Sequence, residues 1–202
     1  MDKRTWDRVG EDFAPGGRDP APGSLHLVQR FLNTRNHEFS SDWDRLGSST
    51  SARSWLVDSG LMAADEQLPE ADRLRLVAFR DALRSLAMAS AGVRLPAGAL
   101  AALNGPAGAC LRLRFGLDGR PVLEPAMGGV DGAMGRILAA GYRAWLDGTW
   151  GRLKGCAQCG WAFYDRSRNR SARWCSMSIC GNRTKNRVYR RRRMDQPGAR
   201  LR

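Results

Sequence analysis

The sequence contains no uninterrupted apolar stretch of about 18 residues, the length that a membrane-spanning helix needs. It has two histidines, His26 and His37, and neither is near a cysteine or part of a paired nucleophile motif. The glycines, including Gly128-Gly129, form no phosphate-binding loop signature. The first 22 residues lack the apolar stretch of a secretory signal. We therefore expect neither a membrane protein nor an enzyme, but a cytoplasmic protein.

Acidic residues are almost missing from the last quarter of the chain. Residues 1–150 contain 18 Lys or Arg and 18 Asp or Glu, whereas residues 151–202 contain 15 and 2. The net charge of +13 therefore lies entirely in the last 52 residues. A segregated excess of this kind attracts a polyanion. A disordered basic tail is the alternative that charge alone leaves open.

The five cysteines divide into two pairs and one isolated residue. Cys156-x2-Cys159 and Cys175-x4-Cys180 have the spacing of structural zinc ligands, four thiolates around one tetrahedral ion. A redox dithiol in the first pair is the alternative, but the sequence around it is not thioredoxin-like. Cys110 is predicted to be a packed thiol rather than a redox sensor. Four ligands and one buried thiol suit a reducing cytosol, and we predict one structural Zn2+.

Most of residues 23–150 shows helical periodicity. Helices are predicted from Leu25 to about Thr34, over Ser51–Ser59, from Pro69 to about Ser90, over Pro96–Leu103 and from Asp131 to about Leu146. The third is expected to bury Leu74 and the last to bury Trp145 and Leu146.

The periodicity changes to two near residue 111. Leu111, Leu113, Phe115 and Leu117 alternate with polar or small residues, and Asp118-Gly119 supplies a tight turn. This pattern predicts an antiparallel hairpin with one buried face. The fold class is therefore α+β, with a mostly helical N-terminal domain that contains a small antiparallel sheet.

The cysteine segment predicts a compact module of its own. Three aromatic residues followed by the polar residues 165–171 predict a short hairpin between the two cysteine pairs: Trp161, Phe163 and Tyr164. Ser176 is expected to cap a helix that starts near Met177, which places Cys180 in its first turn. Knuckle, hairpin and helix together make a treble-clef-like zinc module.

The same segment resembles a known bacterial family. Arg173-Trp174-Cys175-Ser176-Met177, continuing to Cys180-Gly181-Asn182-Arg183, is similar to the signature of CGNR-type zinc fingers. Upstream, Phe31-Leu32-Asn33-Thr34 and Trp55-Leu56 are similar to the ABATE domain that precedes this finger. The resemblance covers roughly residues 23–194 and implies a stress-responsive transcription regulator with an α/β N-terminal domain and a DNA-binding treble clef. It also implies that the four paired cysteines are the metal ligands.

Composition and resemblance together suggest four segments. They are a disordered tail over 1–22, an ABATE-like domain over 23–150 that senses a ligand or partner, a basic CGNR-type finger over 151–194, and a C-terminal tail over 195–202. We expect residues 23–150 to fold without zinc and to bind no DNA alone.

If the basic segment is helical from Met177 to about Arg192, several of its arginines lie on one face of the helix. Arg183, Arg187 and Arg190 then lie on one face, and Arg191 lies on another. Most such side chains contact phosphate, and an asparagine amide can read adenine. The predicted nucleic-acid contacts are Arg183, Lys185, Asn186, Arg187, Arg190 and Arg191.

Asn33 and Thr34 end an apolar helix, where polar residues are helix caps or, as a weaker hypothesis, part of a small-molecule site. The sequence thus predicts a cytoplasmic, nucleoid-associated DNA-binding regulator. One finger offers few base contacts, so we expect a homodimer or another transcription protein to add specificity. Two alternatives remain open, an RNA-binding or ribosome-associated protein and a zinc scaffold that binds an acidic protein.

Overall fold

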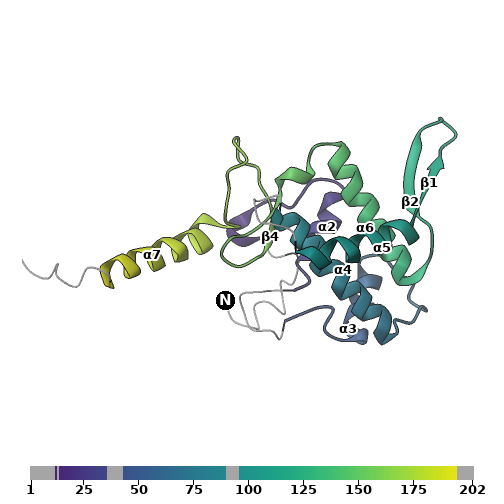
Figure 1. The fold of residues 1–202 in the computed structure, drawn as a ribbon, viewed down its shortest axis with the longest axis horizontal. Helices are drawn as coiled ribbons and strands as arrows, with labels where there is room; N and C mark the ends of the chain where they lie inside the picture. The colour runs from purple at the N-terminus through teal and green to yellow at the C-terminus, as the bar shows by residue number, and fades with distance from the viewer. Residues whose placement is uncertain (1–11, 13, 36–42, 90–95, 195–202) are drawn as a thin grey trace, which may run out of the picture.

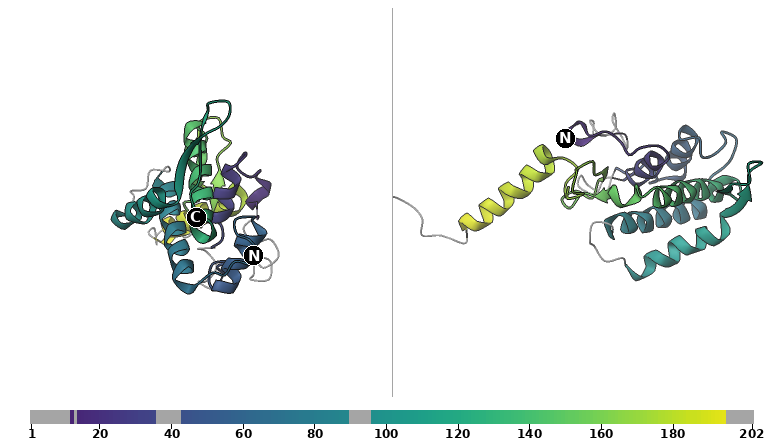
Figure 2. Two further views of the ribbon diagram at one scale, coloured as in Figure 1. Left: turned by 90° about the vertical axis from the view of Figure 1, so that its right-hand side faces the viewer. Right: turned by 90° about the horizontal axis from the view of Figure 1, so that it is seen from above.

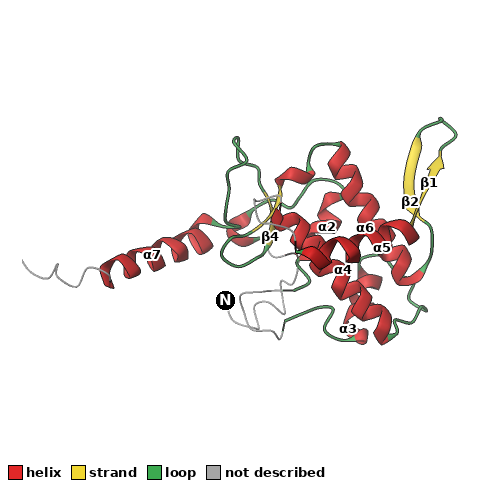
Figure 3. Ribbon diagram, in the orientation of Figure 1, coloured by secondary structure: helices red, strands yellow, loops and turns green. Residues whose placement is uncertain are grey.

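The structure, a computed structural model, describes residues 12, 14–35, 43–89 and 96–194. Five helices form a helical body: α2 (Leu25–Leu32), α3 (Ser49–Asp58), α4 (Glu70–Ala89), α5 (Ala97–Ala109) and α6 (Gly129–Leu146). Two small antiparallel sheets pair β1 (Leu111–Phe115) with β2 (Pro121–Pro125) and β3 (Leu153–Gly155) with β4 (Ala162–Tyr164). The described residues also include three short helical segments, η2 (Pro15–Gly17), η3 (Trp150–Arg152) and η4 (Met177–Gly181). The last of them leads directly into the final helix, α7 (Asn182–Met194). This arrangement confirms the predicted α+β class (Figure 3).

Local signals fix several helix ends, and those at Gly60 and Pro69 lie where the sequence predicted them. The Ser48 side chain accepts a hydrogen bond from the Ser51 backbone N–H, which caps α3. Gly60, just beyond that helix, has a φ of +67°, which favours glycine. Pro69 stands immediately before α4, and Glu70 opens the helix with a negative charge at its positive end.

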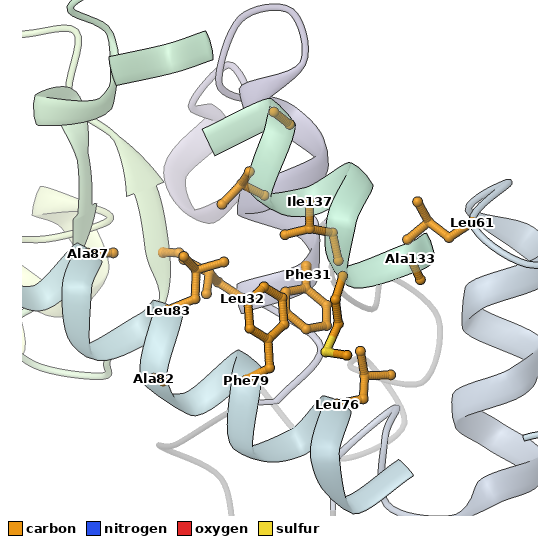
Figure 4. Close-up of a cluster of buried hydrophobic side chains, with 14 of the residues drawn as sticks. Phe31, Leu32, Leu61, Leu76, Phe79, Ala82, Leu83, Ala87, Ala133 and Ile137 are labelled. Carbon is orange, nitrogen blue, oxygen red and sulfur yellow. The ribbon is translucent and has the colours of Figure 1, made fainter. Parts of the chain in front are cut away.

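The core of the helical body lies between α2, α4 and α6 (Figure 4). The ring of Phe31 lies 5.7 Å from the rings of both Trp55 and Phe79, measured between centroids. Ile137 of α6 packs against the same cluster and is fully buried. Burial of such side chains provides the main stabilisation of this region. In the described residues, no helix is long and apolar enough to cross a membrane.

Several predicted details are wrong. Helix α5 continues past Leu103, through Pro106, to Ala109, because the carbonyl of Pro106 still accepts a hydrogen bond from the Cys110 N–H at 2.8 Å. Leu74 is 54% exposed, because the inward face of α4 is centred on Leu76 and Phe79.

Two residues at the end of α6 also differ from expectation. Trp145 is 58% exposed and Leu146 is 70% exposed, so neither is in the core. Trp150 takes the inner position instead; it is buried, and its ring stacks on that of Trp145 at 6.0 Å.

The β1–β2 hairpin forms as predicted, but it has no buried face. Leu113 is 60% exposed and Phe115 is 64% exposed. Only the base of the hairpin packs closely: a Cβ placed on Gly135 of α6 would lie 3.2 Å from the Cα of Pro125. The rest of the hairpin projects past the end of α6 (Figure 1).

Residues 14–22, which we name the N-terminal strap, are not the disordered tail that the composition predicted. Arg18 Nε donates to the carbonyl oxygen of Cys175 at 2.6 Å, and its guanidinium lies 5.0 Å from the ring centroid of Phe163. Arg166 donates to the carbonyl oxygen of Pro20 at 3.0 Å. These long-range contacts hold the strap on the zinc module. The remainder of the predicted 1–22 tail, apart from Asp12, and the predicted 195–202 tail lie outside the described residues.

Candidate metal centre and basic helix

The first cysteine pair lies in the turn of the β3–β4 hairpin. Gly155 pairs with Ala162, and the Cys156 N–H donates to the Trp161 carbonyl at 2.9 Å. Gly160 closes the turn with a φ of +70°. The sequence placed this hairpin between the two cysteine pairs, which is wrong, because β4 pairs upstream with β3 rather than downstream.

Close backbone packing holds this knuckle against the helical body. A Cβ on Gly155 would lie 1.7 Å from the sulfur of Met88 on α4, so a larger residue there would require the Met88 side chain to move. The other predicted turn residue, Gly160, serves the turn itself.

The second cysteine pair spans the start of a helix, as predicted. The Ser176 hydroxyl accepts from the Ile179 N–H at 3.2 Å and caps η4. Cys180 lies in this first turn and is buried. The Ala157 N–H donates to the Arg173 carbonyl at 2.9 Å, which brings the two pairs together.

The four sulfur atoms of Cys156, Cys159, Cys175 and Cys180 lie within 4.8 Å of one another, and all four residues are buried. The Cys159 and Cys175 sulfurs are 3.6 Å apart, as are those of Cys175 and Cys180. A tetrahedron with Zn–S bonds of about 2.3 Å has sulfur–sulfur edges of about 3.8 Å. The donor set therefore fits one structural zinc ion, as the cysteine spacing predicted.

The charge state of the cysteines favours a cation among them. Hydrogen bonds from Cys159 and Cys175 lower the pKa of Cys156, while the hydrogen bond to Cys156 raises the pKa of Cys159. A single thiolate is thus stabilised by its neighbours, and further ionisation needs a positive charge. Zinc supplies that charge, and binding it releases the remaining thiol protons.

A buried ion pair organises the loop between the cysteine pairs. Lys154 Nζ lies 2.8 Å from Asp165 Oδ2, and both side chains are at most 9% exposed. Asp165 also accepts from the backbone N–H groups of Ser167 at 2.9 Å and Ala172 at 3.0 Å. Burial raises the pKa of Asp165, but the hydrogen bonds, that from Lys154 first, outweigh burial and lower it to about 2.

Asn33 and Arg84 connect the zinc module to the helical body, and we name them the clasp. The Asn33 amide donates to the Ala162 carbonyl at 3.0 Å and accepts from the Ala162 N–H at 2.8 Å. Arg84 of α4 donates to the carbonyl oxygens of Gly160 and Leu32. Burial, and then the charge of Arg80, lowers the pKa of Arg84 to about 10.

Sequence reasoning missed Arg84, because charged residues on an amphipathic helix are expected to face water. Its position one turn after Arg80 on the inward face was the available signal. Thr34, the other predicted ligand residue, is buried; its hydroxyl donates to the Phe31 carbonyl at 2.8 Å and accepts from Arg80 at 3.2 Å. The small-molecule site at Asn33 and Thr34 stays a prediction that these contacts do not test.

Helix α7 extends away from the rest of the molecule and has no buried residue (Figure 2). Only its first turns contact the knuckle. The Thr184 hydroxyl lies 3.1 Å from Gln158 Oε1, and Arg187 donates to the same oxygen. The zinc site therefore sets where α7 begins and in which direction it points.

One face of α7 carries a shallow recess that we name the arginine stripe. It is lined by Arg183, Asn186, Arg187, Arg190, Arg191 and Met194. Arg191, which the spacing placed on another face, lies in the stripe. Lys185 is not among the lining residues, since it follows Arg183 by two positions, about 200° around the helix.

Two family models match the chain in the order that the sequence predicted. Residues 25–150 match ABATE, "Putative stress-induced transcription regulator", and this match spans more than half of the 202 residues. The chain belongs to the ABATE family. Residues 152–193 of this ABATE-family chain match the CGNR zinc finger. A search among curated proteins found no match. Neither family description names an enzymatic activity.

Proposed function

We propose that this ABATE-family chain is a DNA-binding transcription regulator whose arginine stripe follows the phosphates of a duplex. The observation that carries the proposal is the composition and exposure of α7. Its 13 residues include seven Lys or Arg and no Asp or Glu, and none is buried. Like charges one turn apart destabilise an isolated helix. A polyanion laid along the stripe would relieve that repulsion.

The dimensions of α7 suit this role. At 1.5 Å per residue, the helix is about 20 Å long, enough to cross a groove and reach phosphates on both of its sides. Arg183, Arg187 and Arg190 share the face that would contact the backbone. Asn186 lies between them and is the best placed side chain to read a base edge.

The remaining parts of the molecule have supporting roles in this proposal. Zinc holds the knuckle, and through Gln158 and Thr184 the knuckle orients α7. The helical body would receive the ligand or partner signal, because the clasp joins α2 and α4 directly to β4 and Gly160. A rearrangement of either helix would therefore reach the zinc module.

The test is the salt dependence of duplex DNA binding by the full chain. Replacing Arg183 and Arg190 with Ala should flatten the slope of log affinity against log salt by about one to two units, because each phosphate contact contributes about 0.9. Arg187 is left in place because it also contacts Gln158. The matched control, Lys185→Ala with Arg192→Ala, removes the same charge from the opposite face and should flatten the slope less.

Two results would contradict the proposal. In the first, truncation after Tyr189 abolishes binding while the Arg183→Ala/Arg190→Ala protein binds normally, which indicates a non-specific basic tail. In the second, structured RNA competes better than duplex DNA, which indicates an RNA-binding protein with the same cations.

A further inference from the structure

The β1–β2 hairpin exposes apolar side chains at the end of the molecule opposite to α7 (Figures 1 and 2). Leu113, Phe115, Leu117 and Val122 are all at least 41% exposed, and Leu117 at the tip is fully exposed. A two-stranded hairpin is marginally stable alone in water. Exposed apolar patches on such an element are typical of interaction sites.

The hydrogen bonds of the hairpin show which backbone groups point outward. The Gly116 N–H donates to the Arg120 carbonyl at 2.9 Å, and the Ala126 N–H donates to the Cys110 carbonyl at 2.9 Å. Hydrogen-bonded pairs alternate along an antiparallel ladder, so the pairs between these two that lack mutual bonds are 111 with 125, 113 with 123, and 115 with 121. The C=O groups of these six residues, and the N–H groups of the four that are not proline, therefore point away from the hairpin.

The two edges of the hairpin consequently differ in chemistry. On β2, two of the three outward positions are Pro121 and Pro125, which have no N–H to donate. Proline is one of the devices by which a strand edge avoids pairing. On β1, the outward positions are Leu111, Leu113 and Phe115, each with a complete donor and acceptor. Among the described residues, no other strand pairs with this edge.

The side chains of β1 indicate what kind of strand fits. Leu113 and Phe115 lie on one face, and Arg112 and Arg114 lie on the other. Within the part of the chain that the structure describes, both arginines share one carboxylate, that of Glu124, which lies 2.9 Å from Arg112 and 3.8 Å from Arg114. An antiparallel β1 strand from a second copy would place arginine opposite arginine in the registers that overlap the two strands most, which is unfavourable. An acidic strand has no such penalty.

We propose that the β1 edge binds an extended segment of a partner protein in which acidic and apolar residues alternate. The segment adds a third strand, with its backbone bonded to Leu111, Leu113 and Phe115, its acidic side chains beside Arg112 and Arg114, and its apolar side chains beside the exposed leucine and phenylalanine. This site is separate from the DNA contacts proposed for α7, so the protein binds both partners at once.

The experiment uses the full chain and a fluorescein-labelled synthetic peptide of alternating glutamate and valine, followed by fluorescence anisotropy. A lysine and valine peptide of equal length should bind at least about tenfold more weakly. Leu113→Pro removes an outward N–H from β1 and should weaken binding by about tenfold or more. Leu123→Pro is the matched control, because it removes an outward N–H from β2 at the directly opposite position.

Two further variants test whether the peptide binds at the β1 edge. Arg112→Glu with Arg114→Glu should invert the preference toward the lysine peptide, which tests the site even if a proline variant misfolds. Because α7 also attracts anions, the Arg183→Ala/Arg190→Ala protein serves as a control. It should still bind the glutamate peptide, since the β1 edge is intact. Equal affinity for both peptides, equal loss in both proline variants, or self-association that Leu113→Pro abolishes would overturn the proposal.

Discussion

The helical body and the zinc module are held together by different forces. The body buries a contiguous apolar core between helices, whereas the module surrounds four sulfurs with a few aromatic side chains and one buried ion pair. The two regions nevertheless share a sheet. Leu153, Ala162 and Tyr164 belong to the core of the body, while Trp161 and Phe163 pack around the cysteines. Side chains on both sides of the family boundary near residue 150 therefore share one buried core.

This shared sheet changes one expectation drawn from the sequence. A chain ending at Trp150 would lack Leu153, Ala162 and Tyr164, and the core behind them would be exposed to water. We now expect residues 23–150 alone to be markedly less stable than the same residues in the full chain.

The sharpest way to separate the two regions is to remove the metal site. Cys175→Ser should abolish stoichiometric zinc binding and unfold the module, because structural zinc contributes on the order of 10 kcal/mol. Helical signal from the body should largely remain. Metal analysis and circular dichroism check both. Cys110→Ser is the control and should retain about one equivalent of zinc; a Cys175→Ser protein with normal zinc content contradicts the assignment.

The next largest effect should come from the clasp residue Arg84. Arg84→Met leaves the buried carbonyl of Leu32 and the half-buried carbonyl of Gly160 without this donor, at a cost of roughly 2 to 4 kcal/mol in the free energy of unfolding. Arg75→Met, on the same helix but with a side chain 50% exposed, should cost less than about 1 kcal/mol. Urea unfolding measures both, and equal losses would show that Arg84 is not specially placed.

A substitution of Asn33, directly after α2, tests the same connection between the helical body and the zinc module. Asn33→Ala removes both hydrogen bonds to Ala162 and should cost about 1 to 3 kcal/mol. It should also make the zinc easier to extract with a chelator, because β4 is then attached less firmly. Asn186→Ala, on exposed α7, is the control and should change neither quantity. Unchanged chelation kinetics in Asn33→Ala would mean that the two regions are not coupled through this residue.

The smallest effect concerns the one cysteine of the body. Burial, followed by the nearby Asp131 charge, raises the pKa of Cys110 to about 11. In the unfolded chain a thiol titrates near about 8.5, so the stabilising contribution is complete below that pH and is lost as the pH rises toward 11. The stability difference between the wild type and Cys110→Ala should therefore shrink over this range in alkaline unfolding measurements. A constant difference would contradict the shifted pKa.

The sequence predicted what local chemistry decides. Cysteine spacing, the Ser176 cap, the helix stop at Gly60 and the helix start at Pro69 depend on residues a few positions apart, and all are present in the structure. The predictions were wrong where a residue's contacts lie far away in the sequence. The pairing of β4 with β3 and the exposure of the β1–β2 hairpin depend on which elements pack together. Hydrophobic periodicity in the sequence does not show this.

Buried charge was the other source of error. Arg80 is fully buried and its Nη2 donates to Asp44 at 2.9 Å, an arrangement that needs a carboxylate 36 positions away. A helix pattern read one residue at a time assigns such an arginine to solvent, and so it also misplaced the apolar face of α4.

The N-terminal strap gives the chain an unusual order of assembly. Arg18 is bonded to the carbonyl of Cys175, 157 residues later, and Gly16 lies so close to Ser176 that a Cβ there would be 2.7 Å from its hydroxyl. At a synthesis rate of about 5 to 20 residues per second, the strap leaves the ribosome roughly 8 to 30 seconds before its docking surface has been made. That surface also needs the zinc ligands in place. Residues 14–22 are thus made early, and we expect them to dock only after the zinc module has folded.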